Sequence, residues 1–300
     1  MFGFKNKKPP IKFFNSIPGV STLYPVTKSS ELIRDWVTQE KKVYNEDVSK
    51  CPIKRFTNIT KPVLGMPPEL ATIISQANDI KRGDEEKLTS IGKCPAINSI
   101  MHNGFIIYAP ADFTVYAPNK EKLDAYYDSD RFPPFVANAP KFPPYIDFHG
   151  APHASWLKDS TKDSTNDTII KIHTMWSVLS DPDIMFLQMK VPYVKENRFT
   201  AVSGILDPML STEINIQLWW HVNEEKETTI KAGTPLAMYL PVSRKLFDNT
   251  EMFVGTADDD DREMLAEYSY LLSSNFSENR KITKIARKLY KKYWNKWTNS

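Results

Sequence analysis

Apolar and polar residues alternate most regularly in one stretch of the chain, residues 200–244. Residues 212–222 follow a period of two, which predicts a half-buried β-strand because successive side chains of a strand point to opposite faces. A second, largely apolar strand is predicted over residues 236–242, after a turn at 231–235. The predicted core face of the first strand carries Ile214, Ile216, Leu218 and Trp220.

Four shorter apolar runs predict further strands earlier in the chain, at residues 105–108, 113–116, 169–176 and 184–191. Turn signals separate them, as at residues 181–183, and we expect Trp176 in the core together with Leu218. These runs predict a mainly β fold over residues 95–245. We expect it to be built as a single β-barrel or a double-sheet core.

Helical periodicity is found at both ends of the chain. Apolar residues recur at helical spacing in residues 30–44, and a short helix is expected over 95–101, before the helix-ending pair Asn103-Gly104. The sequence therefore divides into three segments. They are an N-terminal arm with helical segments (1–94), the β core (95–245) and a C-terminal helical, basic tail (246–300).

The clearest helical pattern covers residues 277–297, where no acidic residue follows Glu278. One stripe is apolar, with Ile282, Ile285, Ala286, Leu289, Tyr290, Tyr293, Trp294 and Trp297. The rest is basic, with Arg280, Lys281, Lys284, Arg287, Lys288, Lys291, Lys292 and Lys296. The aromatic stripe should be buried, and repulsion among the cations favours an acidic surface opposite. That surface is the acidic run 258–261 with Glu263, a protein partner, another copy of the chain, nucleic acid or an anionic membrane.

Composition narrows the class of protein. The 300 residues carry a net charge of only +3, so bulk charge does not indicate nucleic-acid binding. No apolar run reaches the length of about 18 residues that a membrane-spanning helix needs, and the first residues lack the apolar core of a signal peptide. The two cysteines, Cys51 and Cys94, are expected as free thiols in a reducing compartment. We therefore expect a soluble, cytoplasmic protein.

Residues 200–244 resemble two motifs of the deoxyuridine triphosphatase and dCTP deaminase superfamily. Those enzymes have a Gly-hydrophobic-Ile-Asp turn, a Gly-Glu-Ile strand start and a later Gly-x-x-Ile-Ala-Gln strand. The matching residues here are Gly204, Ile205, Leu206, Asp207, Glu213, Ile214, Gly233, Leu236 and Ala237. Leu210 replaces the ring-stacking aromatic residue, and Met238 replaces the glutamine. The resemblance implies a dUTPase-like β fold, and a cupin-type jelly roll is the alternative.

This resemblance implies a catalytic role for Asp207, because its counterpart activates the attacking water or holds the sugar hydroxyl. A general base needs a carboxylate held at a rigid turn, and Glu213 is the second candidate carboxylate. Arg198 is the candidate for binding the ligand with Asp207, although the serines of the superfamily's Arg-Ser-Ser motif are missing. A divalent metal such as Mg²⁺ would belong to this interpretation. Alternatively, Asp207 only caps the turn before Pro208.

A second resemblance, to a family of uncharacterised bacteriophage and bacterial proteins, covers most of residues 1–245. Its pattern begins with Cys-Pro, a helix and a Gly-aromatic-hydrophobic-Ile strand, which match residues 94–107 here. It continues with Trp176, the turn at 204–207 and residues 230–236. That family has no assigned activity. The resemblance implies a phage-type protein in the host cytoplasm or, alternatively, in the virion.

His149 and His153, with Asp147 nearby, are the candidates for a metal site. A spacing of four places two ligands on one face of a helix. Gly150 and Pro152 disfavour a helix at this point. The alternative is a loop that carries two polar imidazoles.

Together these patterns predict a phage-type β protein that resembles nucleotide-processing enzymes but acts as a binding or structural protein. One alternative is a deoxynucleotide hydrolase or deaminase of the dUTP or dCTP type that uses Asp207, so enzymatic activity stays open. Another is a virion structural component. The expected partners are further copies in a homo-oligomer and a protein bound through the C-terminal helix, with nucleic acid or an anionic membrane ranked after them.

Overall fold

The computed structural model describes the β strands and most of the C-terminal helices of the chain. The described residues are 9–15, 20–37, 95–119, 121–127, 146–149, 165–221, 226–248, 252–273 and 280–298. The chain divides into two compact units, one formed by Met1–Arg34 with Ser99–Thr250 and the other by Asp35–Asn98 with Glu251–Ser300. The division into three segments at residues 94 and 245 stays a prediction.

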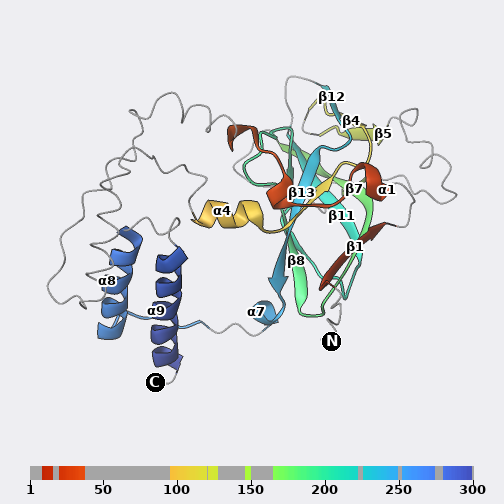
Figure 1. Cartoon of the computed structure of the whole chain (residues 1–300). Helices are drawn as coiled ribbons and strands as arrows, with labels where there is room; N and C mark the ends of the chain where they lie inside the picture. Colours follow the sequence, from red (N-terminus) through yellow and green to blue (C-terminus); the bar gives the residue numbers. More distant parts are fainter. Residues whose placement is uncertain are drawn as a thin grey trace, which may run out of the picture. The chain divides into compact units, whose positions relative to one another are not determined.

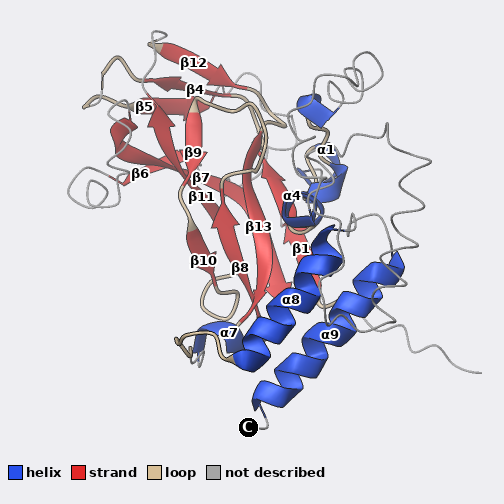
Figure 2. Ribbon diagram, turned by 90° about the vertical axis from the view of Figure 1, so that its left-hand side faces the viewer, coloured by secondary structure: helices blue, strands red, loops and turns tan. Residues whose placement is uncertain are grey.

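Three antiparallel sheets make up the described β structure of the first unit (Figures 1 and 2). The first sheet has the order β1-β7-β11-β9, with β6 also paired to β7: β1 Ile11–Asn15, β6 Ile146–His149, β7 Thr165–Ser180, β9 Phe199–Ala201 and β11 Glu213–His221. The second has the order β10-β8-β13-β3-β2: β2 Thr27–Lys28, β3 Phe105–Tyr108, β8 Ile184–Met189, β10 Gly204–Leu206 and β13 Pro235–Ser243. The third has the order β12-β4-β5: β4 Phe113–Tyr116, β5 Asp124–Tyr127 and β12 Glu227–Ile230.

One hydrophobic core joins the three sheets. The ring of Phe13 on β1 lies 4.9 Å from that of Phe105 on β3 and 6.0 Å from that of Phe186 on β8, between ring centroids. The third sheet contributes Phe113 and Val115 to the same buried cluster. The first and second sheets therefore bury their facing sides against each other, as expected for a double-sheet core.

The predicted closed barrel is not formed, because the described strands fall into three separate sheets. The mainly β prediction is confirmed, and each predicted strand is present. The strand predicted over residues 212–222 is β11 (Glu213–His221), whose alternate residues Ile214, Ile216 and Leu218 are at most 1% exposed. Trp176 and Leu218 are buried as expected. The opposite face of β11 is partly covered as well, since Trp219 is also buried.

The helix predicted over residues 30–44 is formed only in part where the structure describes this segment: residues 29–34 are not α-helical, whereas Asp35–Val37 are helical. Ser29–Glu31 make one turn of 3-10 helix, η1, and Leu32 is extended. The Ser29 amide donates to the carbonyl of Gly104, which continues the β2–β3 pairing. The buried guanidinium of Arg34 donates to the carbonyls of Ser29 and Leu32. These contacts bind carbonyls that the first turn of a helix would need, so the helical pattern is not followed at residues 29–34.

The remaining described helices lie mostly towards the C-terminus. α1 (Val20–Leu23) and α7 (Lys245–Asp248) are single turns, and α4 covers Pro95–His102. α4 ends at His102, just before the pair Asn103-Gly104 that predicted its end, and Gly104 has a φ of 93°, which suits glycine. In the second unit, α8 (Asp259–Ser273) and α9 (Arg280–Thr298) lie side by side (Figure 2). α9 confirms the predicted C-terminal helix.

Candidate functional site

The turn that carries Asp207 lies at one end of the second sheet. Asp207 directly follows β10, and Arg244 directly follows β13. Both strands pair with β8, which runs between them, so the two residues meet beyond the start of β8 at Ile184. Sheet pairing therefore brings together two side chains that are 37 residues apart in the sequence.

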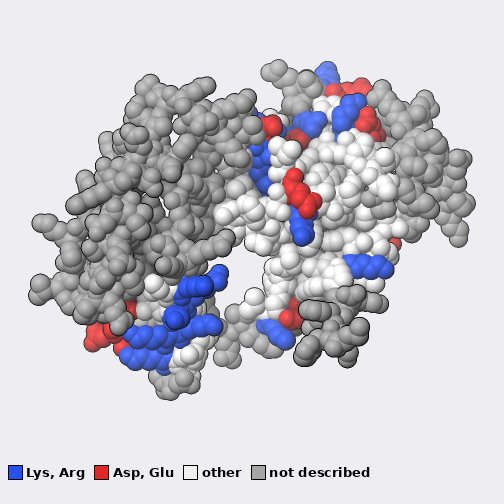
Figure 3. Space-filling view, viewed as in Figure 1, with Lys and Arg blue, Asp and Glu red and all other residues white. Residues whose placement is uncertain are grey.

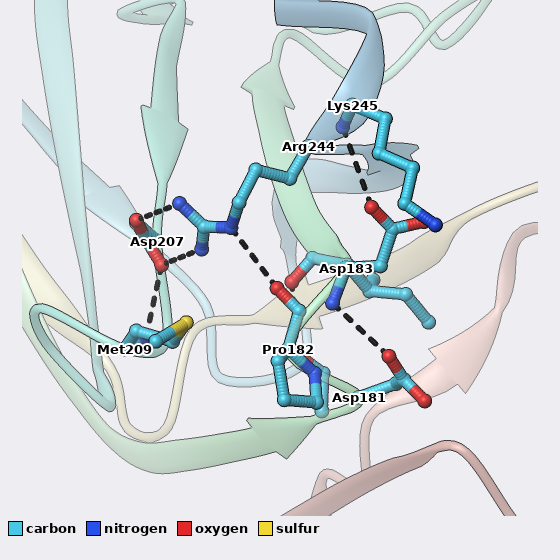
Figure 4. Close-up of polar contacts among 9 residues, drawn as sticks. Asp181, Pro182, Asp183, Asp207, Met209, Arg244 and Lys245 are labelled. Atoms are coloured by element: carbon cyan, nitrogen blue, oxygen red, sulfur yellow. Dashed lines mark hydrogen bonds and ion pairs between the residues drawn. The ribbon is translucent and has the colours of Figure 1, made fainter. Parts of the chain in front are cut away.

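Arg244 binds both oxygens of the Asp207 carboxylate (Figure 4). Its Nη1 donates to Oδ2 at 2.7 Å and its Nη2 donates to Oδ1 at 2.5 Å. The amide of Met209 donates to Oδ1 at 2.9 Å, and the amides of Leu210 and Ser211 donate to the Asp207 carbonyl. Asp207 is thus both one half of a two-pronged ion pair and the cap of its own turn.

The electrostatics of this pair hold Asp207 in its charged form. The hydrogen bonds from Arg244 are the main cause that lowers the pKa of the carboxyl, and the Met209 amide and the Arg244 charge add to it, against a smaller opposing effect of burial. A general base needs a carboxylate oxygen directed at the water it activates. Here both oxygens accept hydrogen bonds from Arg244, and Oδ1 accepts a second one from the Met209 amide.

A second carboxylate fixes the neighbouring turns. Asp183, in the β7–β8 turn, accepts hydrogen bonds from the Ser243 hydroxyl and from the Lys245 amide that begins α7. The Arg244 amide and its Nε donate to the carbonyls of Asp183 and Pro182. The turn at residues 181–183 was predicted from the sequence, but its link to the residues after β13 was not. Only the pairing of β8 with β13 brings the two together.

Exposed apolar side chains surround this polar cluster. Leu210 is 87% exposed and Met209 is 67% exposed, on the turn capped by Asp207. Leu246 and Phe247, on α7, are 66% and 55% exposed. We call these residues, with the partly exposed Ile205 of β10, the loop-end surface: Ile205, Met209, Leu210, Leu246 and Phe247. The Asp207–Arg244 pair joins the two turns that carry them.

The other two predicted site residues, Glu213 and Arg198, lie at opposite ends of β11. Glu213 begins β11 with an exposed side chain opposite Ser177. Arg198 lies at the other end of this strand, where its carbonyl accepts from the His221 amide. Eight residue steps of strand separate these ends, about 26 Å. The guanidinium of Arg198 binds the Glu196 carboxylate through Nε and Nη2, and the Thr229 carbonyl through Nη1.

The histidine candidates are only partly covered by the structure. His149 is exposed on β6, opposite Ile169, and His153 is outside the described residues. Asp147 lies 3.6 Å from Nε2 of His173 on β7. In the described part of the chain, no three His, Cys, Asp or Glu side chains are arranged to hold a metal ion. Cys51 and Cys94 are also outside it.

A buried polar network went unpredicted. The Tyr239 hydroxyl on β13 donates to Oε1 of Gln188 on β8, and Gln188 Nε2 donates to the Val202 carbonyl at 2.7 Å and to Gln217 at 3.2 Å. Burial raises the pKa of Tyr239 far above its ordinary value, so it stays a neutral donor. The network joins the second sheet to β11 of the first. A glutamine within the apolar run of β8 was the available signal in the sequence.

Comparison with known proteins adds no identification: no protein-family model, curated protein or solved structure matches the chain. The superfamily and phage-family resemblances therefore stay expectations that rest on the residues quoted for them. A search of the described helices for a membrane-spanning segment finds none that is long and apolar enough.

Proposed function

We propose that this protein is a non-catalytic structural protein that associates with further copies of itself through the loop-end surface. The observation that carries the proposal is the Asp207–Arg244 pair, in which both oxygens of the best catalytic candidate are bound by the protein. An enzyme of the dUTPase type would need that carboxylate directed at its substrate. Arg198 and Glu213 lie at opposite ends of β11, and this separation also argues against a nucleotide site that includes both.

The chemistry of the loop-end surface supports an interface between identical copies. Its side chains are apolar, and the charges at its centre are neutralised within the Asp207–Arg244 pair. Contiguous exposed apolar side chains mark interaction sites in soluble proteins, and charged residues are depleted at the centre of interfaces. In a two-fold dimer the same patch faces itself, so it has to be self-complementary. A mainly apolar patch meets that requirement.

The fold is compatible with the same proposal. Within the double-sheet architecture, a dUTPase-like or jelly-roll arrangement is the finer description that we propose, on the motif residues 204–207 and 233–237. Both kinds of fold serve many functions, so fold alone decides none. A virion component, the alternative that the resemblance to the phage family implies, is one form of such a structural protein.

Two measurements test the proposal. Light scattering after size exclusion should give a dimer or larger assembly for the wild type and a smaller mass for Leu210→Asp. The control Leu179→Asp, at an exposed leucine on β7, should keep the wild-type mass. Incubation with each deoxynucleoside triphosphate and Mg²⁺ should release neither pyrophosphate nor ammonia. A monomeric wild type would refute self-association, and turnover that is lost in Asp207→Asn would establish the enzyme instead.

A further inference from the structure

Helices α8 and α9 pack against each other along a contact that we call the seam. Part of the apolar stripe of α9 lies outside this seam. Ala286 and Tyr293 are buried, and the Tyr293 hydroxyl lies beside Glu263 and Glu267 of α8, where burial is the first cause that raises its pKa. Tyr290, Trp294 and Trp297 are 54%, 49% and 53% exposed. Positions 290, 294 and 297 share one face of a helix. We call these three residues the aromatic ridge.

The acidic residues of α8 already neutralise some of the cations of α9. Lys296 forms an ion pair with Asp260, and Lys292 lies 3.8 Å from Glu267. The pair with Asp260 places one residue of the acidic run 258–261 against the helix, and Glu267 lies outside that run. These contacts also split the six basic residues of α9 whose side chains the structure describes into a paired set and an unpaired set. The unpaired set, exposed and without an ion pair in the described chain, is Lys284, Arg287, Lys288 and Lys291.

The unpaired cations lie next to the aromatic ridge. At 100° per residue, Arg287 is 20° around the helix from Trp294, and Lys291, Lys284 and Lys288 follow within about a further 100°. Figure 3 shows Lys and Arg side chains gathered along α9. The outer surface of α9 is therefore an aromatic strip bordered by a cationic strip, a pattern that neither the seam with α8 nor the loop-end surface uses.

We propose that α9 binds the surface of an anionic membrane, with the aromatic ridge in the headgroup region and the unpaired cations on the lipid phosphates and carboxylates. Amphipathic helices with Trp on one face and Lys or Arg beside it bind lipid interfaces in this way. Trp and Tyr favour that layer because each has an apolar ring and a polar N–H or O–H. The proposal does not depend on the loop-end surface or its self-association.

The ridge itself favours lipid over other anionic partners. The rings of Tyr290 and Trp294 stack on each other at 6.3 Å and 12°, and Trp297 lies 5.3 Å from Trp294. Single-stranded nucleic acid stacks its bases on free aromatic faces, and here the Trp294 ring already has two aromatic neighbours, one of them stacked on it. Lysines are depleted at the centre of protein interfaces, whereas three lysines and one arginine border this ridge. A lipid surface needs neither a free ring face nor a lysine-poor border.

The test is co-sedimentation of the full-length protein with vesicles of phosphatidylcholine alone or with phosphatidylserine added. Binding should require phosphatidylserine and fall as salt rises. Trp294→Ala should weaken vesicle binding about fivefold, because about half of the Trp294 side chain is exposed and would be transferred from water to the membrane. The triple variant Arg287→Gln, Lys288→Gln, Lys291→Gln should weaken it about 100-fold, since each cation near such a surface contributes a factor of several. Phe148→Ala, and the triple Lys190→Gln, Lys195→Gln, Lys226→Gln, are matched controls at exposed positions of the β core and should bind normally.

Folding and location are checked separately. Circular dichroism of each variant should show the wild-type helix content, because the altered side chains are exposed. Brominated lipids should quench part of the tryptophan emission of the wild type. They should quench a smaller part of the emission of Trp294→Phe. The proposal is overturned by equal binding to both vesicles, by no binding, or by binding that the α9 variants leave unchanged. It is also overturned if Trp294→Ala instead abolishes binding to single-stranded DNA or lowers the mass of the protein in solution.

Discussion

Replacing Asp207 with asparagine tests the structural role of this carboxylate directly. The substitution keeps the shape of the side chain and one acceptor for the Met209 amide, but it removes the charge and gives Arg244 an N–H group in place of an oxygen. A hydrogen bond to a charged group contributes about 1.5–3 kcal/mol. The side chains of Asp207 and Arg244 are 14% and 24% exposed, so solvent screens part of this contribution. We expect a loss of about 1–2 kcal/mol in the free energy of unfolding.

The assay is thermal and urea unfolding of Asp207→Asn, Arg244→Gln and the double variant. The expected loss lowers the melting temperature by about 2–8 °C for a domain of this size. The two single losses should not add, because each removes the same pair, and the coupling energy should be about 1–2 kcal/mol. Glu213→Gln is the matched control at an exposed carboxylate, with a change within about 0.5 kcal/mol.

The dependence on pH has a defined sign. Because the pKa of Asp207 is lowered in the folded state, its contribution is complete above the ordinary carboxyl pKa of about 4 and is lost as the pH falls through the lowered value. The difference between wild type and Asp207→Asn should therefore shrink below about pH 4. Equal stability of the two proteins at neutral pH, or additive losses in the cycle, would show that the pair contributes nothing.

Two further predictions concern the core of the first unit. Leu218→Ala removes a fully buried side chain of β11 and should lower the free energy of unfolding by about 2–5 kcal/mol in urea titration, and a loss under about 0.5 kcal/mol would mean that this side chain is not in the core. Tyr239→Phe leaves Oε1 of Gln188 without the hydroxyl donor and should cost about 1–3 kcal/mol by the same measurement, whereas an unchanged stability would show that Gln188 finds another donor.

Local patterns in the sequence determined the elements. The period of two in residues 212–222 gave both the strand β11 and its buried face, because a half-buried strand selects apolar residues at every second position. The 3.6-residue period of residues 280–298 gave α9 by the same kind of selection. The Asn103-Gly104 pair gave the end of α4, since only glycine adopts a positive φ there without strain. These features depend on residues close together in the chain.

Tertiary structure decided the features that depend on distant residues. The first residues of the helix predicted over 30–44 are not helical, because Arg34 and the β2–β3 pairing bind the backbone of this segment, which no local pattern shows, and the helical turn is found at Asp35–Val37. Asp207 was recognised as a turn residue, but its partner Arg244 is brought to it by two strands that flank β8. The aromatic stripe of α9 was expected to be buried as a whole. Among the described side chains of α9, only Ala286 and Tyr293 are buried. Two packed helices share only a narrow contact, which leaves the neighbouring face of α9 to solvent.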